Sequence, residues 1–261
     1  IVLGDKEIHI EGLHGVISND LRFYGLIVPT LDLQGISSSI SSLGPSVTPR
    51  NMLSVLNSIS PRGLLKETVV YAAVDSELKD FRFVSLLDGA RVNAYLGSPA
   101  IDQLNGLISI GMDSGYIDID NDQFNMHFES MFKRSWPFSS ARGRINYRYD
   151  GSAFRFSSGL IELLYGDLAA YGKLQVNLPT RREQHTWGLA IGINDGDLLD
   201  AHRYLPNTLS PQLLSWLDTS VKGGDAQETG LLFHGSLFRG SPKIRKVFET
   251  YFRVDDAILA Y

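Results

Sequence analysis

The sequence contains no cysteine among its 261 residues, which excludes disulfide bonds, thiolate nucleophiles and cysteine metal sites together. No apolar run reaches the ~18 residues that a membrane-spanning helix needs. No basic segment followed by an apolar one opens the chain, so no signal peptide is predicted. An excess of basic charge is also lacking, since the net charge is −5 and the pI is about 5.7. This balance argues against a nucleic-acid partner, because surfaces that bind nucleic acid carry a basic stripe.

Hydrophobic residues make up 43% of the chain and charged residues 20%, so the sequence can bury a sizeable core and is not typical of a disordered protein. Both ends lie in apolar runs, at Ile1–Leu3 and Ala257–Tyr261, and not in polar termini. We therefore expect residues 1–261 to be a fragment of a longer protein, with any targeting or anchoring segment outside it. Within the fragment we expect loose sub-parts at 1–60, 61–200 and 201–261.

A period of two dominates the chain. Apolar side chains alternate with polar or small ones, so that each segment, as a β-strand, has one apolar and one polar face. One-sided burial of this kind is typical of antiparallel sheets. The sequence therefore predicts a mainly β fold with an extended, curved antiparallel sheet. The candidates for its apolar face are Ile108, Ile110, Ile117, Ile119, Ile145, Tyr147, Phe154, Phe156, Leu174, Val176, Leu189 and Ile191.

Turn signals separate the alternating segments. A hairpin-like unit also recurs at irregular intervals: a glycine opens an alternating segment, which a turn joins to a second one. Stacked units of this kind predict an extended sheet. The expected turns are Asp88-Gly89, Asp150-Gly151 and Asn194-Asp195-Gly196. The recurring units begin at Gly15, Gly106 and Gly143.

Two segments depart from this pattern and predict short amphipathic helices. The first starts at Thr48-Pro49, carries apolar residues at helical spacing and ends at Pro61. The second starts at Ser210-Pro211, and Gly223-Gly224 is expected to end it. The serines at positions 37–39 are interpreted as a loop.

One acidic segment has the spacing of a calcium-binding loop. Asp118, Asp120 and Asp122 alternate, and Glu129 stands at the twelfth position of such a loop. The sixth position, however, is Gln123, where the sharp turn needs glycine, and the flanks alternate like strands. The favoured interpretation is the solvated face of a strand that runs into a turn.

A second cluster joins Asp195, Asp197 and Asp200 to His202, a combination that could hold a metal ion or act as an acid–base pair. No second histidine stands at ligand spacing, so a solvated turn is favoured. The sequence contains no nucleophile elbow and no phosphate-binding glycine loop. We therefore expect no enzymatic activity, no cofactor and no metal.

Two features bear on contact with lipids. The basic groups Arg181-Arg182 and Lys243, Arg245 and Lys246 could touch anionic headgroups, although a solvated basic turn is the favoured interpretation. The apolar strand faces leave two interpretations open. They could form the core of an ordinary sandwich or barrel, because every soluble sheet needs a buried face. Alternatively, a lipid chain could cover them.

A set of motifs occurs in order along the C-terminal part of the sequence. These motifs are Arg203-Tyr204-Leu205-Pro206, Ser215-Trp216-Leu217-Asp218, Gly223-Gly224, Leu231–Leu237 and Val254–Tyr261. Further motifs lie upstream, at Ser60-Pro61-Arg62-Gly63, Leu104-Asn105-Gly106, Ser114–Asp118 and Ala141–Ile145. In the C-terminal part the sequence thereby resembles the YhdP family of AsmA-like proteins, in which the same motifs occur in the same order, and upstream the likeness is weaker but continuous. One departure follows Pro242, where the family usually has an aromatic residue.

The resemblance implies a periplasmic protein of Gram-negative bacteria, anchored in the inner membrane by a segment outside these residues. It implies a long, taco-shaped β-groove whose apolar interior, lined by the candidates above, binds phospholipid between the two membranes. The implied role is upkeep of the outer-membrane permeability barrier, and membrane proteins at the ends of the full-length chain are implied as further partners. Two alternatives stay open: a scaffold that assembles outer-membrane proteins, and a hydrolase that uses Asp197 and His202.

Overall fold

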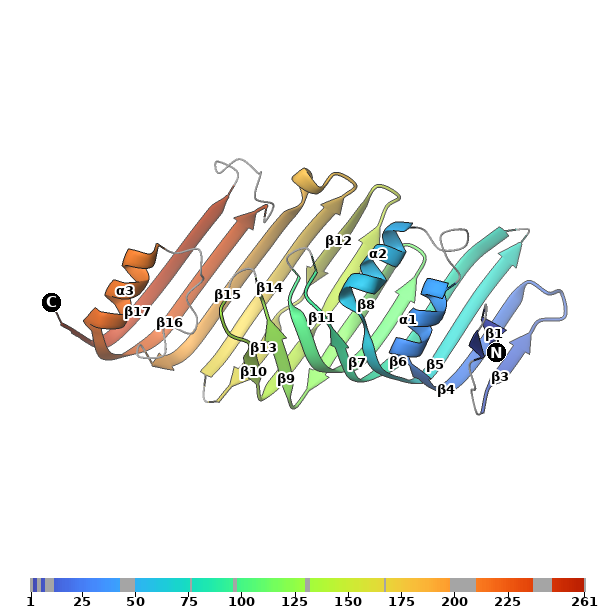
Figure 1. Cartoon of the computed structure of the whole chain (residues 1–261), viewed down its shortest axis with the longest axis horizontal. Helices are drawn as coiled ribbons and strands as arrows, with labels where there is room; N and C mark the ends of the chain where they lie inside the picture. Colours follow the sequence, from blue (N-terminus) through green and yellow to red (C-terminus); the bar gives the residue numbers. More distant parts are fainter. Residues whose placement is uncertain are drawn as a thin grey trace. The chain divides into compact units, whose positions relative to one another are not determined.

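The structure is a computed structural model that describes all residues except 1, 4–5, 8–11, 43–49, 76, 96–97, 130–131, 167, 198–209, 237–245 and 261. The chain divides into two compact units, Ile1–Asn121 and Asp122–Tyr261. Among the described residues, fifteen strands lie in antiparallel sheet and two more form a separate hairpin (Figure 1). The mainly β, antiparallel fold predicted from the alternating pattern is confirmed.

The first unit is a meander in which consecutive strands, from β3 to β8, are neighbours in the sheet. Helices α1 and α2 separate β4 from β5 in the sequence, and α1 contacts β4, β5 and α2. The elements are β1 (Val2–Leu3), β2 (Lys6–Glu7), β3 (His14–Ile17), β4 (Phe23–Asp32), α1 (Leu33–Ser42), α2 (Arg50–Ile59), β5 (Arg62–Asp75), β6 (Glu77–Val92), β7 (Ala100–Gly111) and β8 (Ser114–Asn121).

In the second unit the strand order is β11-β12-β14-β15-β16-β17, and β13 also pairs with β11 and β14. Strands β12 and β13 thus share one position between β11 and β14, and Gly159 and Leu160 separate them. The elements are β9 (Phe124–His127), β10 (Trp136–Phe138), β11 (Ser140–Tyr149), β12 (Ala153–Ser158), β13 (Ile161–Tyr165), β14 (Leu168–Pro179), the 3-10 turn η1 (Arg182–Gln184), β15 (Thr186–Asp197), α3 (Pro211–Ser220), β16 (Val221–Gly235) and β17 (Val247–Leu259).

Helix α1 is a feature that the sequence did not predict. It contains the serines at 37–39, so their interpretation as a loop is wrong. The Asp32 carboxylate accepts a hydrogen bond from Gly35 N at 2.6 Å and so satisfies one amide of the first turn. Ser39 Oγ donates to Gly35 O at 2.8 Å, which gives a buried hydroxyl a partner inside the helix. The low helix propensity of glycine and serine concealed this capped segment.

The two predicted helices are confirmed as α2 and α3. Ser210 caps α3, because its hydroxyl accepts a hydrogen bond from Leu213 N at 3.2 Å. The predicted glycine stop is wrong. The helix ends at Ser220, and Gly223 and Gly224 lie inside β16, where its pairing with β17 shifts register.

Only one of the three expected glycine turns is a turn. Asp150-Gly151 connects β11 to β12, as predicted. Asp88-Gly89 lies instead within β6, at a register shift between Leu87 and Ala90, because an Asp-Gly pair fits a β-bulge as well as a hairpin. Asn194-Asp195-Gly196 continues β15, since pairing with β16 holds this segment in the sheet. The two turn predictions are therefore wrong.

The three recurring glycine-led units are antiparallel hairpins. They correspond to β3–β4, β7–β8 and β11–β12. In β7–β8 and β11–β12 the pairing places apolar side chains on a common face, as with Ile108 opposite Ile117 and Tyr147 opposite Phe156. In β3–β4 the apolar side chains lie on both faces. The prediction that these three units are hairpins is confirmed.

The first unit buries one face of its sheet beneath the helices. Val28, Leu65 and Leu87 are nearly inaccessible there, as are the polar residues Thr68 and Ser85. The hydroxyls of Thr68 and Ser85 lie 2.8 Å apart and satisfy each other, which offsets the cost of burying them. Cross-strand pairing places Leu65 opposite Leu87, so these leucines share the helix-covered face.

The chain exposes 16251 Å² of surface to solvent. A compact protein of the same mass would expose ~11,400 Å². The excess is expected where sheets are covered on one side only in part, because side chains on an uncovered face stay partly accessible.

Gly106 in β7 occupies a position that no other residue fits. Its φ is +152°, and a Cβ added there would overlap the carbonyl oxygen of Asp118 in the neighbouring strand. Gly192 in β15 offers a contrast, since an added Cβ would have no atom within 4 Å. The close approach of β7 to β8 thus depends on a glycine at position 106.

We predict that Gly106→Ala lowers the free energy of unfolding of the unit containing it by about 3 kcal/mol, because either β8 moves or the backbone is strained. Gly192→Ala is the matched control and should change stability by less than about 1 kcal/mol. Urea denaturation followed by circular dichroism measures both. Equal stability of the two variants would contradict the role assigned to Gly106.

Candidate functional site

One face of the second unit is apolar across consecutive strands. Cross-strand pairing aligns Tyr147 of β11 with Phe156 of β12, and Phe156 with Val176 of β14. Val176 in turn lies opposite Trp187 of β15. Directly opposed residues of an antiparallel sheet point to the same side. The four residues therefore form one row of a common surface, named here the apolar face.

Further rows continue the apolar face toward β17. Leu174 pairs with Leu189, and Leu189 with Phe233 of β16. Phe233 lies opposite Phe248 of β17. The apolar face comprises Ile145, Tyr147, Tyr149, Phe154, Phe156, Leu174, Val176, Leu178, Trp187, Leu189, Ile191, Ile193, Leu231, Phe233, Phe248 and Phe252.

The structure thus gathers the predicted residues of the second unit on a single face. These residues are Ile145, Tyr147, Phe154, Phe156, Leu174, Val176, Leu189 and Ile191. Their side chains are only partly buried, apart from Val176 at 3% exposure, and Phe154 remains 44% exposed. Partial exposure shows that this face is not the interior of a densely packed core.

The predicted residues of the first unit share a face of β7 and β8. Ile108 lies opposite Ile117, and Gly106 lies between Leu87 and Ile119. Ile110 has the same orientation as Ile108, two residues away along β7. This is the face that holds the buried Leu87 beneath the helices.

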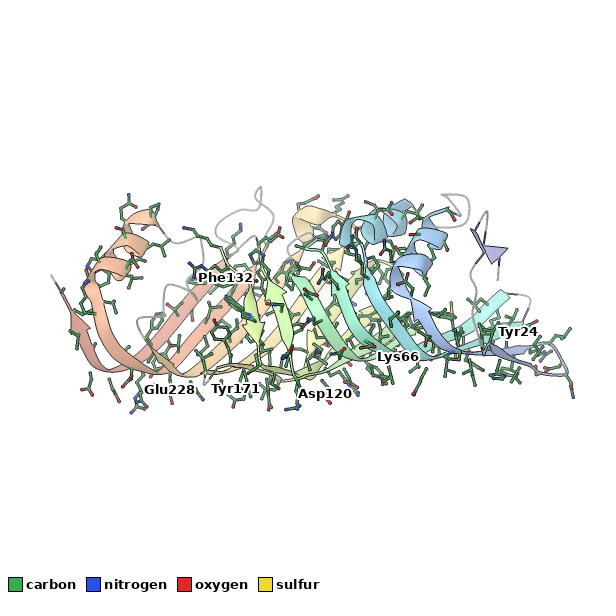
Figure 2. All side chains as sticks on the ribbon, turned by 60° about the horizontal axis from the view of Figure 1, so that its bottom comes forward. Tyr24, Lys66, Asp120, Phe132, Tyr171 and Glu228 are labelled. Atoms are coloured by element: carbon green, nitrogen blue, oxygen red, sulfur yellow. The ribbon has the colours of Figure 1, made fainter. Side chains whose placement is uncertain are left out.

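The opposite face of the second unit carries mainly polar side chains. Asn146 pairs with Ser157, and Ser157 with Gln175. Arg148 pairs with Arg155 in the adjacent row. Figure 2 shows Tyr171 and Glu228 on the outer side of the sheet, away from Phe132. The alternation seen in the sequence therefore separates the two faces chemically.

An aromatic cluster closes one end of the apolar face. The rings of Phe132 and Trp136 lie 4.4 Å apart, and Phe138 is 6.1 Å from Trp136. Phe138 also contacts Phe124 and Tyr165, at 6.2 and 6.4 Å. Phe124, Phe132 and Phe138 are each about 5% exposed. These five residues are named here the aromatic rim, and they fix β9 and β10 against the end of β13.

A histidine supports this cluster. His127 Nε2 lies 3.2 Å from the carbonyl oxygen of Phe132 and joins the end of β9 to the segment that carries the Phe132 ring. His185 plays a similar part elsewhere, with Nε2 at 3.0 Å from Pro179 O. Both imidazoles hold backbone segments in place. Within the described part of the chain, neither belongs to a group of three or more histidine or acidic residues that could bind a metal.

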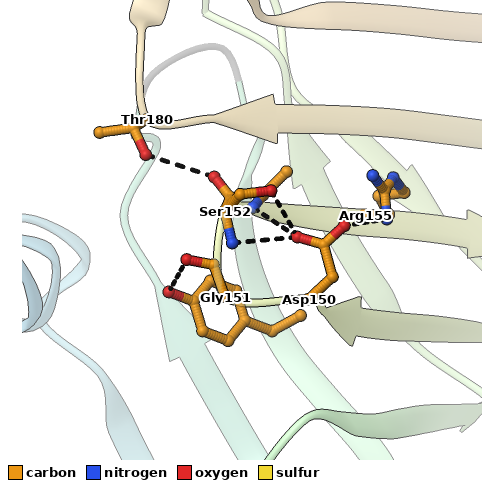
Figure 3. A network of polar contacts seen from close by, with 7 residues as sticks. Asp150, Gly151, Ser152, Arg155 and Thr180 are labelled. Carbon is orange, nitrogen blue, oxygen red and sulfur yellow. Dashed lines mark hydrogen bonds and ion pairs between the residues drawn. The ribbon is translucent and has the colours of Figure 1, made fainter.

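The other end of the apolar face is polar (Figure 3). In the turn between β11 and β12, Asp150 accepts hydrogen bonds from the hydroxyl and amide of Ser152, at 2.7 and 3.0 Å. Its second carboxylate oxygen pairs with Arg155 at 2.5 Å. Thr180 Oγ1 donates to Ser152 O at 3.3 Å and ties this turn to the end of β14.

The same hydrogen bonds lower the pKa of Asp150 well below its ordinary value of 3.8. The largest cause is the hydrogen bond from the Ser152 hydroxyl, followed by the amides of Ser152 and Ala153 and then by Arg155. Each of these contacts favours the ionised carboxylate. Asp150 therefore stays charged in the folded protein even in mildly acidic solution.

The acidic segment at Asp118–Glu129 is not built like a calcium loop. Asp118 and Asp120 lie in β8, which continues upstream to Ser114 where such a loop has a helix, and β9 (Phe124–His127) occupies positions inside the loop itself. Figure 2 places Asp120 on the outer side of its strand. Among the described residues, no group of three or more histidine, aspartate or glutamate side chains is placed to hold a metal ion.

Several other predictions fall where the structure gives little or no description. Asp200 and His202 lie outside the described residues, and Asp195 and Asp197 are described only as backbone of β15. Lys243 and Arg245 are likewise outside. Arg181 is exposed in the connection between β14 and β15. No helix in the described part of the chain has the length and apolarity to cross a membrane.

Sequence reasoning missed the aromatic rim and part of the apolar face. Phe124, Phe132 and Trp136 come from a segment without regular alternation, so only their clustering in space identifies them. Phe248 and Phe252 gave a usable signal, since they lie four residues apart in β17 and therefore on one face.

Because the carboxyl of Asp150 has a lowered pKa in the folded state, its contribution to stability is present above pH 3.8 and is lost as the pH falls through the lower folded-state value. We predict that an NMR titration of the Asp150 carboxyl has its midpoint below 3.8 in folded protein. Ser152→Ala should raise this midpoint, whereas Ser157→Ala, on the polar face of β12, should leave it in place. A midpoint that Ser152→Ala does not move would contradict the cause assigned here.

The comparisons with known proteins point to one family. The sequence model of the YhdP protein family matches residues 18–261. No curated protein and no solved structure matches the chain. The match covers both the helix-bearing first unit and the apolar face of the second. The resemblance noted in the C-terminal motifs therefore extends over nearly the whole sequence, and the chain belongs to the YhdP protein family.

Proposed function

We propose that this chain is a segment of a bridge-like lipid-transfer protein, in which the apolar face carries the acyl chains of phospholipids between the inner and outer membranes. The observation that supports this most directly is the cross-strand register of the second unit, which aligns apolar side chains across β11, β12, β14, β15 and β16. Membership of the YhdP family is consistent with this function.

The chemistry of the apolar face suits a ligand that slides. Acyl chains are bound through buried area, at ~0.8 kcal/mol per CH₂ group, without directional contacts. A surface of similar side chains in successive strands therefore offers neighbouring positions of similar free energy. The partial exposure of Phe248 and Phe252, at 41 and 50%, leaves apolar area that a chain would cover. Such a surface allows an acyl chain to move from one position to the next and does not hold it at a single site.

The proposal includes a location. A protein that transfers phospholipid between the inner and outer membranes must be located in the periplasm. We propose that a segment outside these residues anchors it in the inner membrane. Its work would then support the permeability barrier of the outer membrane. The face of the sheet that is turned to water has to be polar, and the row of Asn146, Ser157 and Gln175 lies on that face.

We predict that photo-reactive amino acids at Ile145, Phe156 and Leu189 capture phospholipid in cells, because these side chains point to the apolar face. The matched controls are their neighbours Asn146, Ser157 and Ala190, which lie on the opposite face of the same strands. Mass spectrometry of the purified adducts should find at least fivefold more lipid in the first set.

Equal capture on both faces, or none on the apolar face, would sink the proposal. Protein adducts concentrated at the edge strand β17 would favour the alternative of an assembly scaffold for outer-membrane proteins. Photo-reactive residues at Tyr251 and Arg253, which are exposed in β17, test that outcome in the same experiment.

A further inference from the structure

The first unit exposes apolar side chains on the face of its sheet that points away from the helices. Ile27 of β4 pairs with Val69 of β5, and Val69 pairs with Val84 of β6, so the three side chains form one row. The next residues in sequence, Val28 after Ile27 and Thr68 before Val69, are buried on the helix-covered face. The row therefore points the other way. Ile27 and Val69 are 47 and 44% exposed there.

A second row extends this uncovered surface. Tyr71 pairs with Gly25, and Gly25 pairs with Val16 of β3, which is 68% exposed. Phe23 lies two residues before Gly25 on the same side, and its ring stacks on that of Tyr71 with the centroids 6.1 Å apart. The exposed apolar residues of the two rows are named here the outer patch: Val16, Phe23, Ile27, Val69 and Tyr71.

The exposure of the outer patch is not the effect of a sheet edge. Strand β4 lies between β3 and β5, and β5 lies between β4 and β6, so the strands that carry four of the five residues have neighbours on both sides (Figure 1). A further strand at the edge would extend the sheet sideways and leave its faces as they are. A partner that covers the outer patch must therefore pack onto the face of the sheet.

The size of the outer patch fits a protein interface. Its five side chains together expose on the order of 400 Å² of apolar surface, which is within the range of functional patches on single proteins. A stable interface buries ~800 Å² on each partner, and ~57% of that area is non-polar, or ~450 Å². The outer patch thus supplies the apolar part of one side of such an interface.

The border of the outer patch carries charges of both signs. Lys66 of β5 and Asp88 of β6 form an ion pair on this face. Arg82 lies opposite Tyr71, and Asp80 lies two residues from Arg82 on the same side. An anionic membrane surface attracts clusters of basic residues, whereas the charges at this border are balanced. An apolar centre with a border of this kind is complementary to a second copy of itself about a two-fold axis.

We propose that the outer patch is the interface of a two-fold symmetric dimer, in which the sheets of two first units pack face to face. The occupant of the patch is thus a second copy of this chain. Packed sheets lie ~10 Å apart with their side chains interdigitated, and the β-branched residues Val16, Ile27 and Val69 suit this arrangement. The interface belongs to the first unit alone and does not depend on lipid binding by the apolar face of the second.

Cysteine cross-linking tests the interface directly, because the chain contains no cysteine of its own. Val69→Cys places a single thiol in the outer patch. Leu232→Cys is the matched control, since Leu232 is also 44% exposed and lies opposite Ala190 on the polar face of the second unit. A bismaleimide that spans the ~10 Å between packed sheets should link at least fivefold more Val69→Cys protein into dimers than Leu232→Cys protein.

Sedimentation velocity detects the same dimer without a cross-link. The unaltered chain should pass from monomer to dimer as its concentration rises to ~100 µM, because interfaces of this size have dissociation constants of about micromolar or lower. Val69→Lys should stay monomeric, since the interface would bury two unpaired charges. Leu232→Lys should dimerise like the unaltered chain. Val16→Lys replaces Val69→Lys if circular dichroism shows that the latter does not fold.

Three results would overturn the proposal: an unaltered chain that is monomeric at every concentration, a dimer that persists in the folded lysine variant, or equal cross-linking of the two cysteine variants. A monomeric chain that binds vesicles of phosphatidylethanolamine and phosphatidylglycerol, and loses this binding with Val69→Lys, would also overturn it and assign the outer patch to membrane contact. Lipid capture by the apolar face is a separate measurement, so each proposal fails independently of the other.

Discussion

The cross-strand register of the second unit is the constraint on which its chemistry depends. Successive side chains of a strand point to opposite sides, so a slip of one residue would exchange the two faces of that strand. The pairing of Tyr147 with Phe156, of Phe156 with Val176 and onward to Trp187 contains no shift. Shifts occur instead where β16 meets β17, near Gly223. The apolar face exists because the central strands keep one register.

The sequence predicted this face well, because apolar residues alternate with polar or small ones along these strands. Ile145, Phe156 and Leu189 could be assigned to one surface without knowledge of the strand order. The places where prediction was wrong are those where pairing, and not local sequence, decides. Asp88-Gly89 became a bulge and Asn194–Gly196 stayed in β15, because neighbouring strands supply hydrogen bonds that a short segment does not reveal.

Helix α1 and the aromatic rim mark two further limits of prediction, with different causes. The sequence contains the capping residue of α1, Asp32, but the glycine and serines that follow have low helix propensity and made the segment resemble a loop. Closer attention to capping residues would have identified this helix. The aromatic rim had no such signal. Phe138 contacts Phe124 through the pairing of β10 with β9, and it contacts Tyr165 of β13, so these contacts join segments that lie apart in the sequence.

Strands β12 and β13 occupy one position between β11 and β14, and Gly159 and Leu160 separate them. Both β12 and β13 pair with β11 on one side and with β14 on the other. The alignment of β11 with β14 therefore does not depend on either of the two short strands alone. Insertions or deletions at Gly159 and Leu160 during evolution would change only the connection between β12 and β13 and leave the pairing of both strands in place. A sheet that contains many such interrupted strands can therefore vary in chain length while one face stays apolar and the other stays polar.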